Sequence, residues 1–233
     1  MVSVSNSSNI AIVIGASGGI GAAIANALTA RDAEVFQESR SQTGLDITDE
    51  ASIAERAANV EEALGGRTAD LIFIATGVLA PPNHGPEKAF AAIDAGAMAA
   101  TFAVNAFGPA LIVKHFAPLL ARDRRVVLAA LSARVGSIGD NRLGGWMSYR
   151  ASKAALNQFM RCAAIEFKRT HKQSVFAALH PGTIETPLTR AHARGRYTAS
   201  AEEAATNLLK VLDNLSPEAT GGFYAYDGQE IPW

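Results

Sequence analysis

The sequence has a single cysteine, Cys162, among its 233 residues. One thiol cannot form a disulfide within the chain, which excludes a small secreted scaffold held by disulfides and fits a reducing compartment. Cys162 has apolar neighbours in a segment of helical spacing, so we expect it to pack rather than to act as a nucleophile. Residues 1–9 are rich in Ser and Asn and lack the basic and apolar regions of a signal peptide. We therefore expect a flexible N-terminus over 1–9 and a cytoplasmic protein.

The sequence also lacks an excess of charge of either sign, because 21 Lys and Arg residues oppose 22 Asp and Glu residues for a net charge of −1. This balance predicts that neither a nucleic acid nor an anionic membrane is a partner. The longest stretch without charge, 95–113, has the length of a membrane span, but it is rich in small residues and contains Asn105, Gly108 and Pro109. We expect a buried or interface helix pair there.

Paired metal ligands are a further absence from the sequence. The five histidines are His84, His115, His171, His180 and His192. None of them is spaced from another as in H-x-x-x-H, so we predict no catalytic metal.

Apolar residues make up 48% of the chain and charged residues 18%, so the chain can bury a core and should fold as one domain over 1–233. Six runs are typical of strands: Ile10–Ile14, Glu34–Glu38, Leu71–Ala75, Val126–Leu131, Val175–Leu179 and Phe223–Tyr226. Segments with helical spacing alternate with them: Ile20–Ala30, Ser52–Leu64, Met98–Leu120, Tyr149–Thr170 and Ala201–Leu215. We predict a single-domain Rossmann-type α/β fold, a doubly wound parallel sheet with helices on both faces.

A glycine-rich turn follows the first apolar run and leads into an Ala-rich helix. Such a turn brings backbone N–H groups close to a phosphate, and the positive end of the helix favours the anion. The spacing is neither G-x-G-x-x-G nor that of a P-loop, and a loop that merely turns the chain is the alternative. The turn lies, however, where ligands bind in open α/β sheets. The residues predicted to contact a nucleotide here are Gly15, Ser17, Gly18, Gly19, Ile20 and Gly21.

The end of the second strand predicts which dinucleotide is bound. A carboxylate at this place pairs with the 2′-hydroxyl of NAD, whereas an Arg accommodates the 2′-phosphate of NADP. Here Ser39 and Arg40 end the strand, directly after Glu38. We favour NADP(H) over NAD(H), with Glu38 as the argument for NAD(H) and a solvated surface charge as the other interpretation of Arg40.

Tyr149 and Lys153 stand four residues apart at the start of a predicted helix, which places them on one helical face. An ammonium beside a phenol stabilises the phenolate and lowers the phenol pKa from about 10 toward the working pH. Tyr149 would then exchange a proton with a substrate oxygen. An ordinary amphipathic helix, with a packed Tyr and a solvated Lys, is the alternative.

Taken together, these motifs resemble one family. The features found in its order and spacing are the glycine turn, the Tyr149 and Lys153 pair, Ser132 after the fifth strand, Asn105 in the preceding helix, and Pro181-Gly182 after the sixth strand. The sequence from about Ile10 to the C-terminus thus resembles the short-chain dehydrogenase/reductase family. The subgroup that it resembles, small NADPH-dependent carbonyl reductases of the C-factor and sniffer type, is indicated by Leu131-Ser132-Ala133-Arg134, Gly136-Ser137-Ile138, the run from Tyr149 to Asn157, and Tyr226-Asp227-Gly228.

The resemblance implies a role for each of these side chains. Tyr149 would give a proton to a carbonyl, and Lys153 would hydrogen-bond the nicotinamide ribose and lower the phenol pKa. Ser132 would polarise the substrate oxygen, and Asn105 would hold a water in a proton relay behind the lysine. Singly, Ser132 could be only a strand-end hydroxyl and Asn105 only a helix-bending residue. The other implied cofactor contacts are Asp46 near the adenine, the Ala75-Thr76-Gly77 segment, and Pro181, Gly182, Ile184 and Thr186 along the nicotinamide.

Some positions depart from the family pattern. Ile14 and Ala75 replace a Thr and an Asn of the family, and the segment between Ser132 and Tyr149 is longer than usual. We expect that longer segment to form a loop beside the substrate pocket, and residues 186–200 to form a substrate lid.

We predict a homodimeric or homotetrameric oxidoreductase, an NADP(H)-dependent short-chain dehydrogenase/reductase that interconverts a small-molecule carbonyl and its alcohol. The alternative is a catalytically silent sensor or structural protein that binds a nicotinamide nucleotide.

Overall fold

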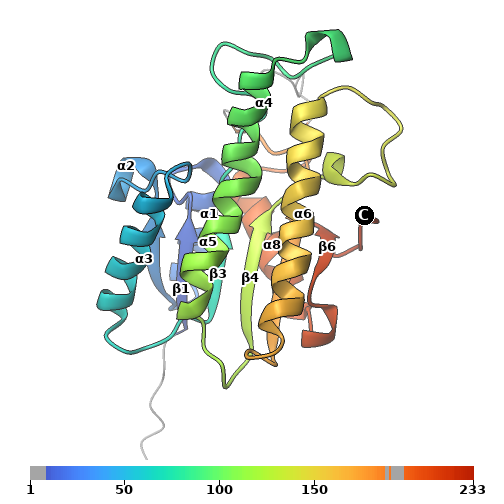
Figure 1. Cartoon of the computed structure of the whole chain (residues 1–233). Coiled ribbons are helices and arrows are strands. Elements are labelled where there is room, and N and C mark those ends of the chain that lie inside the picture. The colour runs from blue at the N-terminus through green and yellow to red at the C-terminus, as the bar shows by residue number, and fades with distance from the viewer. Residues whose placement is uncertain (1–8, 187–188, 190–196) are drawn as a thin grey trace, which may run out of the picture.

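The computed structural model describes residues 9–186, 189 and 197–233 (Figure 1). Within them one parallel sheet has the strand order β2-β1-β3-β4-β5-β6. The strands are β1 (Ile10–Ile14), β2 (Glu34–Glu38), β3 (Leu71–Ile74), β4 (Val126–Leu131), β5 (Ser174–His180) and β6 (Gly222–Ala225). The predicted Rossmann-type fold is confirmed. Counted along the described chain, Ser132 follows the fourth strand and Pro181 the fifth, so the predicted strand numbers were each one too high.

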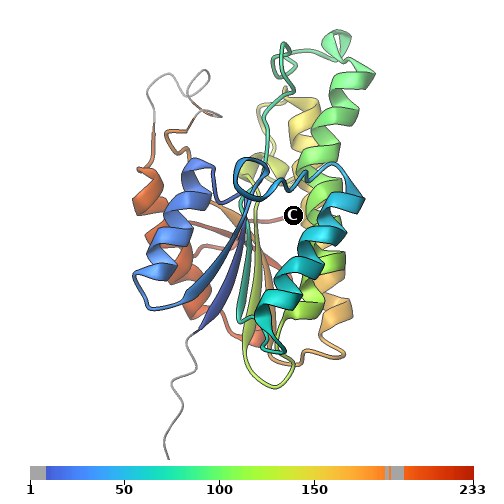
Figure 2. The same cartoon turned by 90° about the vertical axis from the view of Figure 1, so that its left-hand side faces the viewer.

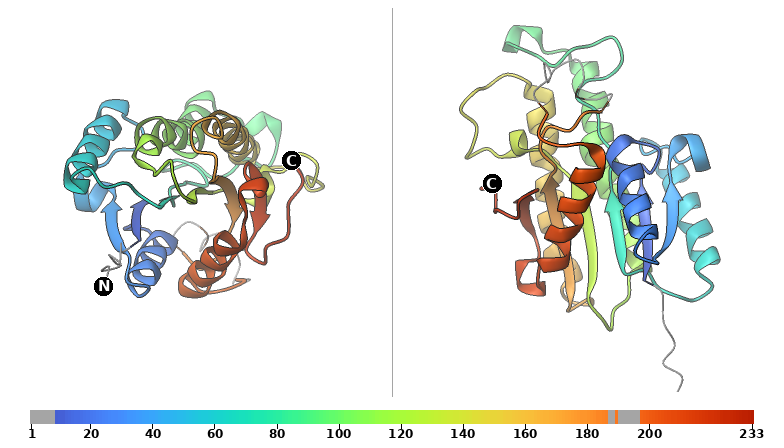
Figure 3. Two further views of the ribbon diagram at one scale, coloured as in Figure 1. Left: turned by 90° about the horizontal axis from the view of Figure 1, so that it is seen from below. Right: turned by 180° about the vertical axis from the view of Figure 1, so that it is seen from behind.

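Helices cover both faces of the sheet (Figures 2 and 3). One layer holds α1 (Gly19–Thr29) and α8 (Ala201–Asn214), and the other holds α3 (Glu50–Leu64), α5 (Gly108–Phe116) and α6 (Met147–Phe167). Each layer encloses its own core, because successive residues of a strand face opposite sides. Ile12 and Ile14 of β1 lie in the core under α3, α5 and α6, whereas Ala11 and Val13 lie in the core under α1 and α8.

The helical run Ala95–Leu119 is long and apolar enough, by length and composition, to cross a membrane. It comprises α4 (Ala95–Phe102), a π-helical turn (Ala103–Phe107), α5 and a 3₁₀ turn. Ile112 and Phe116 are fully buried in the core under α5. The run lies beside α6 and α3 in one helical layer on the sheet (Figure 1). The expected buried or interface helix pair over 95–113 is therefore one helical run that packs on the sheet.

The structure differs from the sequence prediction at several local points. The short helix α2 (Arg40–Thr43), which Ser39 caps, was not predicted. Cys162 is exposed, because the buried face of α6 carries Met160 and Ala163 and turns position 162 to the opposite side. The N-terminal segment expected to be flexible lies, except for Asn9, outside the described residues.

Candidate active site

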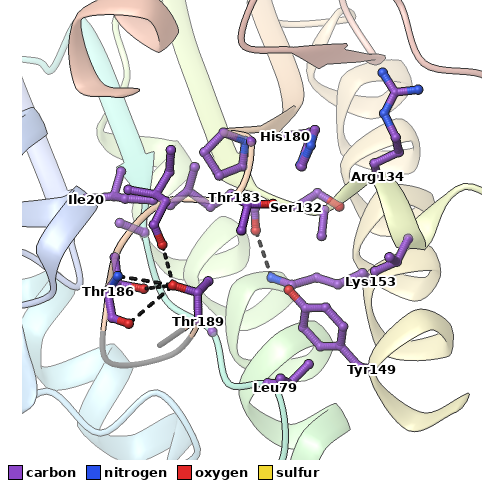
Figure 4. A pocket seen from close by; sticks show the side chains of 18 of the residues that line it. Ile20, Leu79, Ser132, Arg134, Tyr149, Lys153, His180, Thr183, Thr186 and Thr189 are labelled. Atoms are coloured by element: carbon purple, nitrogen blue, oxygen red, sulfur yellow. Dashed lines mark hydrogen bonds between the residues drawn. The ribbon is translucent and has the colours of Figure 1, made fainter. Parts of the chain in front are cut away.

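A cavity of about 850 Å³ lies at the carboxyl ends of the strands. From β1 the chain passes to β2 on one side and returns to β3 on the other, which makes the gap between β1 and β3 the topological switch point. The cavity extends from there across β4 and β5 (Figure 4). Predicted site residues that line it are Ser17, Gly18, Gly19, Ile20, Ala75, Thr76, Gly77, Ser132, Tyr149, Lys153, Pro181, Gly182, Ile184 and Thr186.

The glycine turn closes tightly on itself. Gly15 has a φ of +84°, and its N–H donates to the main-chain oxygen of Glu38 at 2.7 Å. A Cβ on Gly21 would stand 2.1 Å from the carbonyl oxygen of Gly15. Gly15 and Gly21 therefore shape the turn without lining the cavity, while the residues between them form its wall.

The end of β2 lies outside the cavity lining and carries two ion pairs. Arg40, whose side chain is 70% exposed, contacts Asp46 with Nη2 at 3.0 Å from Oδ1. Hydrogen bonds from Thr48 are the main cause of the lowered pKa of Asp46, and Arg40 adds to them. Glu38 is buried, and its carboxylate accepts two 2.9 Å hydrogen bonds from Arg56 of α3. Arg40 is thus exposed at the strand end, while the Glu38 carboxylate is already occupied.

Tyr149, Lys153 and Ser132 meet on the other side of the cavity (Figure 4). Tyr149 and Lys153 lie on the buried face of α6, as their spacing predicts. Lys153 Nζ donates to the carbonyl oxygen of Leu131 at 2.8 Å, which ties α6 to the end of β4. Ser132 follows directly, and its N–H donates to Leu179 of β5 at 2.7 Å.

Burial moves both pKa values in this pair. Desolvation raises the pKa of the Tyr149 phenol to about 12 and lowers the pKa of Lys153 to about 7. The direction for Tyr149 is opposite to the one predicted from the spacing. The reason is that burial of the phenol disfavours its charged phenolate form, and the spacing of the two residues does not reveal this burial.

Asn105 lies in the π-helical turn and is fully buried. Its Oδ1 accepts from the N–H of Val78 and its Nδ2 donates to the carbonyl oxygen of Val78, both at 2.8 Å. Nδ2 also contacts Ser152 Oγ at 3.1 Å. A Cβ on Gly77 would stand 3.3 Å from Lys153 Nζ and 3.4 Å from Asn105 Oδ1. Asn105 therefore does not line the cavity, but it holds the strand-end segment against Lys153.

Part of the cavity wall is apolar. Leu79, Val135, Leu143 and Trp146 line it, together with Arg134, which is ion-paired to Asp140 at 3.1 Å. Most of these residues come from the long segment between Ser132 and Tyr149, as predicted for a loop beside the pocket. That segment ends in a left-handed Trp146, whose N–H donates to the main-chain oxygen of Glu87.

The flanks of the segment 186–200 converge at the cavity. The N–H of Thr198 donates to the carbonyl oxygen of Thr183 at 2.8 Å, and Ile184 forms a β-bridge with Ala199. Thr186 and Thr189 line the cavity. Most of the predicted lid, residues 187–188 and 190–196, lies outside the described part of the chain.

Two polar residues near the site were not predicted. His180 lines the cavity, and burial lowers its pKa to about 4. Asn157 accepts a hydrogen bond from Ser132 Oγ. The sequence carried a signal for each residue. His180 stands directly before Pro181, and Asn157 stands one helical turn after Lys153. In the parts of the chain that the structure describes, no cluster of three or more His, Cys, Asp or Glu side chains could hold a metal ion.

Comparison with known proteins identifies the family of the chain. The sequence matches the short chain dehydrogenase family over residues 9–196. The C-signal protein of Myxococcus xanthus is 35% identical over 141 residues, covering 60% of this chain and 81% of that protein. The NADPH-bound carbonyl reductase from chicken fatty liver has a TM-score of 0.85 at 27% identity, covering 97% of this chain and 99% of that one. The carbonyl reductase Sniffer of D. melanogaster has the same fold, with a TM-score of 0.84 at 20% identity over 97% and 99% of the two chains.

These likenesses confirm the predicted family, with the C-signal protein among its relatives, and the Sniffer structure confirms the fold. The family match spans both the glycine turn and the Tyr149 and Lys153 pair. The chain therefore belongs to the short-chain dehydrogenase family of oxidoreductases.

Proposed function

We propose that this protein is an NADP(H)-dependent carbonyl reductase whose general acid is Tyr149. One observation carries the proposal: a single cavity is lined by the glycine turn at one end and by Tyr149, Lys153 and Ser132 at the other. A nucleotide and a small carbonyl compound therefore fit the two ends of one site.

The residues present fit a nicotinamide dinucleotide. Thr76 Oγ1 is buried without a hydrogen-bond partner among the described residues, and it belongs to the segment that faces the glycine turn. An orphaned hydroxyl at a strand end fits a ligand with polar groups. Ser17 to Ile20 would hold the pyrophosphate at the start of α1, and Thr76, Gly77 and Ile184 would hold the nicotinamide half. The cofactor would supply the hydride.

Tyr149 would give its proton to the carbonyl oxygen as the alcohol forms. Burial supports this direction, because a phenol with a pKa of about 12 stays protonated at neutral pH and is ready to donate. Lys153, with a pKa of about 7, would contribute positive charge beside the phenol when protonated. Ser132 would donate a second hydrogen bond to the same oxygen.

The end of β2 supports NADP(H) over NAD(H). Arg40 is exposed beyond the strand and would pair with a 2′-phosphate, in competition with Asp46. Glu38 would have to leave Arg56 in order to accept from a ribose 2′-hydroxyl. The carboxylate that argued for NAD(H) in the sequence is therefore not free.

The outer face of the helical layer supports self-association into a homodimer or homotetramer. Phe107, Phe159 and Ile165 are exposed there, at 51%, 37% and 55%. Apolar side chains on one helical layer are typical of a protein contact. Sedimentation of the purified chain measures the oligomer, and a monomer at all concentrations would contradict this part of the proposal.

Turnover is the direct test. Purified protein mixed with NADPH and a panel of carbonyl compounds, including a diketone such as diacetyl and a quinone, should consume the reduced cofactor. We expect apolar carbonyl compounds to react best, because Leu79, Val135, Leu143 and Trp146 form an apolar part of the cavity wall. Tight NADPH binding with no turnover across the panel would contradict the proposal and support the silent sensor instead.

A further inference from the structure

Ser132 has a buried partner that does not line the cavity. Its Oγ donates to Oδ1 of Asn157 at 2.7 Å, and the two residues are only 4% and 2% exposed. Asn157 lies on the same face of α6 as Tyr149 and Lys153, one turn beyond the lysine. Ser132 lines the cavity and Asn157 does not, and among the described residues the one hydrogen bond of the Asn157 side chain comes from the Ser132 hydroxyl.

This hydrogen bond occupies the only proton of the Ser132 hydroxyl. A hydroxyl has one donor and two acceptor positions, so a Ser132 that donates to Asn157 cannot also donate to a substrate oxygen. The amide nitrogen of the same Asn157 is buried with no hydrogen-bond partner among the described residues. An orphaned N–H donor in a protein interior is destabilising, because its desolvation is not offset by a hydrogen bond.

A half-turn of the Asn157 amide reverses both features. Nδ2 then donates to Ser132 Oγ, and the Ser132 proton becomes free to point into the cavity. The orphaned group becomes Oδ1, and a buried carbonyl oxygen without a donor is tolerated better than a buried N–H without an acceptor. In one amide orientation the Ser132 hydroxyl donates to Asn157, and in the other it is free to donate to a substrate oxygen.

We propose that Asn157 is a positioning residue that sets the direction of the Ser132 proton, turning its amide so that Ser132 donates to the carbonyl oxygen of the substrate. The inference rests on the proposed function, because it assigns Asn157 a role through Ser132. It also explains why an amide is useful at this position, since an amide can both accept and donate.

Asn157→Asp, assayed at alkaline pH where a buried carboxyl is ionised, gives the sharpest test, because the carboxylate has nearly the shape of the amide but only accepts. We expect it to hold the Ser132 proton and to lower kcat about 10- to 100-fold, with the KM for NADPH unchanged. Asn157→Ala removes the competing acceptor and should lose less than Asn157→Asp. A purely structural role predicts the reverse order, because Ala leaves a cavity.

Two controls separate this effect from charge and from general damage. In a Ser132→Ala background, Asn157→Asp should cause no further loss of kcat, because there is no hydroxyl proton left to hold. Gln158→Glu makes the same chemical change one residue away on an exposed part of α6 and should leave kcat unchanged.

The wild-type protein provides a second measurement that does not depend on the folding of any Asp variant. The side-chain amide signals of Asn157 in a ¹⁵N–¹H spectrum, assigned by their absence from Asn157→Ala, should shift downfield when NADP⁺ and diacetyl are bound. The shift reports a new hydrogen bond from Nδ2 and should be missing in Ser132→Ala.

The outcomes distinguish the two proposals. Absence of turnover by the wild type would overturn the proposed function and this inference with it. Full activity of Ser132→Ala would overturn the role of Ser132, and with it this inference, but would leave carbonyl reduction with Tyr149 as the acid in place. If the wild type is active and Ser132→Ala is not, the inference alone is overturned by any of three results. These are wild-type kcat in Asn157→Asp, a loss in Asn157→Ala as large as in Asn157→Asp, or amide signals that stay in place when the ligands bind.

Discussion

The ammonium nitrogen of Lys153 lies 2.8 Å from the carbonyl oxygen of Leu131, the last residue of β4. This bond places the lysine directly before Ser132 and joins the helix that carries Tyr149 to the strand that carries the serine. The Lys153 side chain is only 3% exposed, so its amine is poorly solvated. The Lys153 amine therefore contributes both to the stability of the fold and to the arrangement of the site.

The first prediction concerns the pH dependence of stability. Burial lowers the pKa of Lys153 from 10.5 to about 7. Between pH 7 and pH 10.5 the amine therefore carries its proton in the unfolded chain but not in the folded one. The stability due to the neutral amine is present above pH 10.5 and is lost as the pH falls toward 7. Lys153→Met should remove this slope, a change of the order of 3 kcal/mol across the window. Urea unfolding of both proteins from pH 7 to 10 measures it, and identical slopes would refute the prediction.

Tyr149→Phe should abolish carbonyl reduction while leaving the cofactor bound. Loss of a positioned general acid lowers kcat about 10²- to 10⁴-fold. Stopped-flow measurement of NADPH consumption gives kcat, and NADPH fluorescence gives the dissociation constant. Tyr226→Phe, which makes the same change at a residue that does not line the cavity, is the control. Retention of the wild-type rate by Tyr149→Phe would show that another group is the acid.

Arg40→Ala should weaken NADPH binding about 10- to 100-fold and leave NADH binding unchanged, because a charge-assisted hydrogen bond contributes about 1.5–3 kcal/mol. Fluorescence titration with both cofactors measures this. Arg31→Ala is the matched control, since Arg31 is also a surface arginine paired with an aspartate, Asp213, at 3.0 Å. A wild type that binds NADH as tightly as NADPH would contradict the role proposed for Arg40.

Gly21→Ala should disrupt the glycine turn, because its Cβ would stand 2.1 Å from the carbonyl oxygen of Gly15. Overlap with main-chain atoms cannot be relieved by a side-chain rotation, so we expect a loss of about 1–3 kcal/mol of stability. NADPH binding should weaken as well. Thermal unfolding and fluorescence titration measure the two effects. Gly85→Ala, at a position with no heavy atom within 4 Å of the added Cβ, should change neither, and equal effects at both glycines would count against this reading of the turn.

Much of the fold can be predicted from the sequence because its signals are local. The residues of β1 and β4 form unbroken apolar runs, and every residue of both strands is buried. Tyr149 and Lys153 lie on one face of α6 because residues four positions apart lie on the same side of a helix. The boundaries were less exact, and the four-residue helix α2 was missed, because so short an element has no periodicity to detect.

Partners from remote parts of the chain were not predictable in the same way. The sequence by itself determined the alternation of strands and helices, the glycine turn and the shared face of Tyr149 and Lys153. Only the tertiary structure decided that Glu38 is held by Arg56, that Lys153 binds Leu131 and that Ser132 donates to Asn157. The physical reason is that helix and strand periodicity depends on neighbours a few residues apart, whereas burial, pKa values and the direction of a proton depend on groups that meet only when the sheet and its helices have packed.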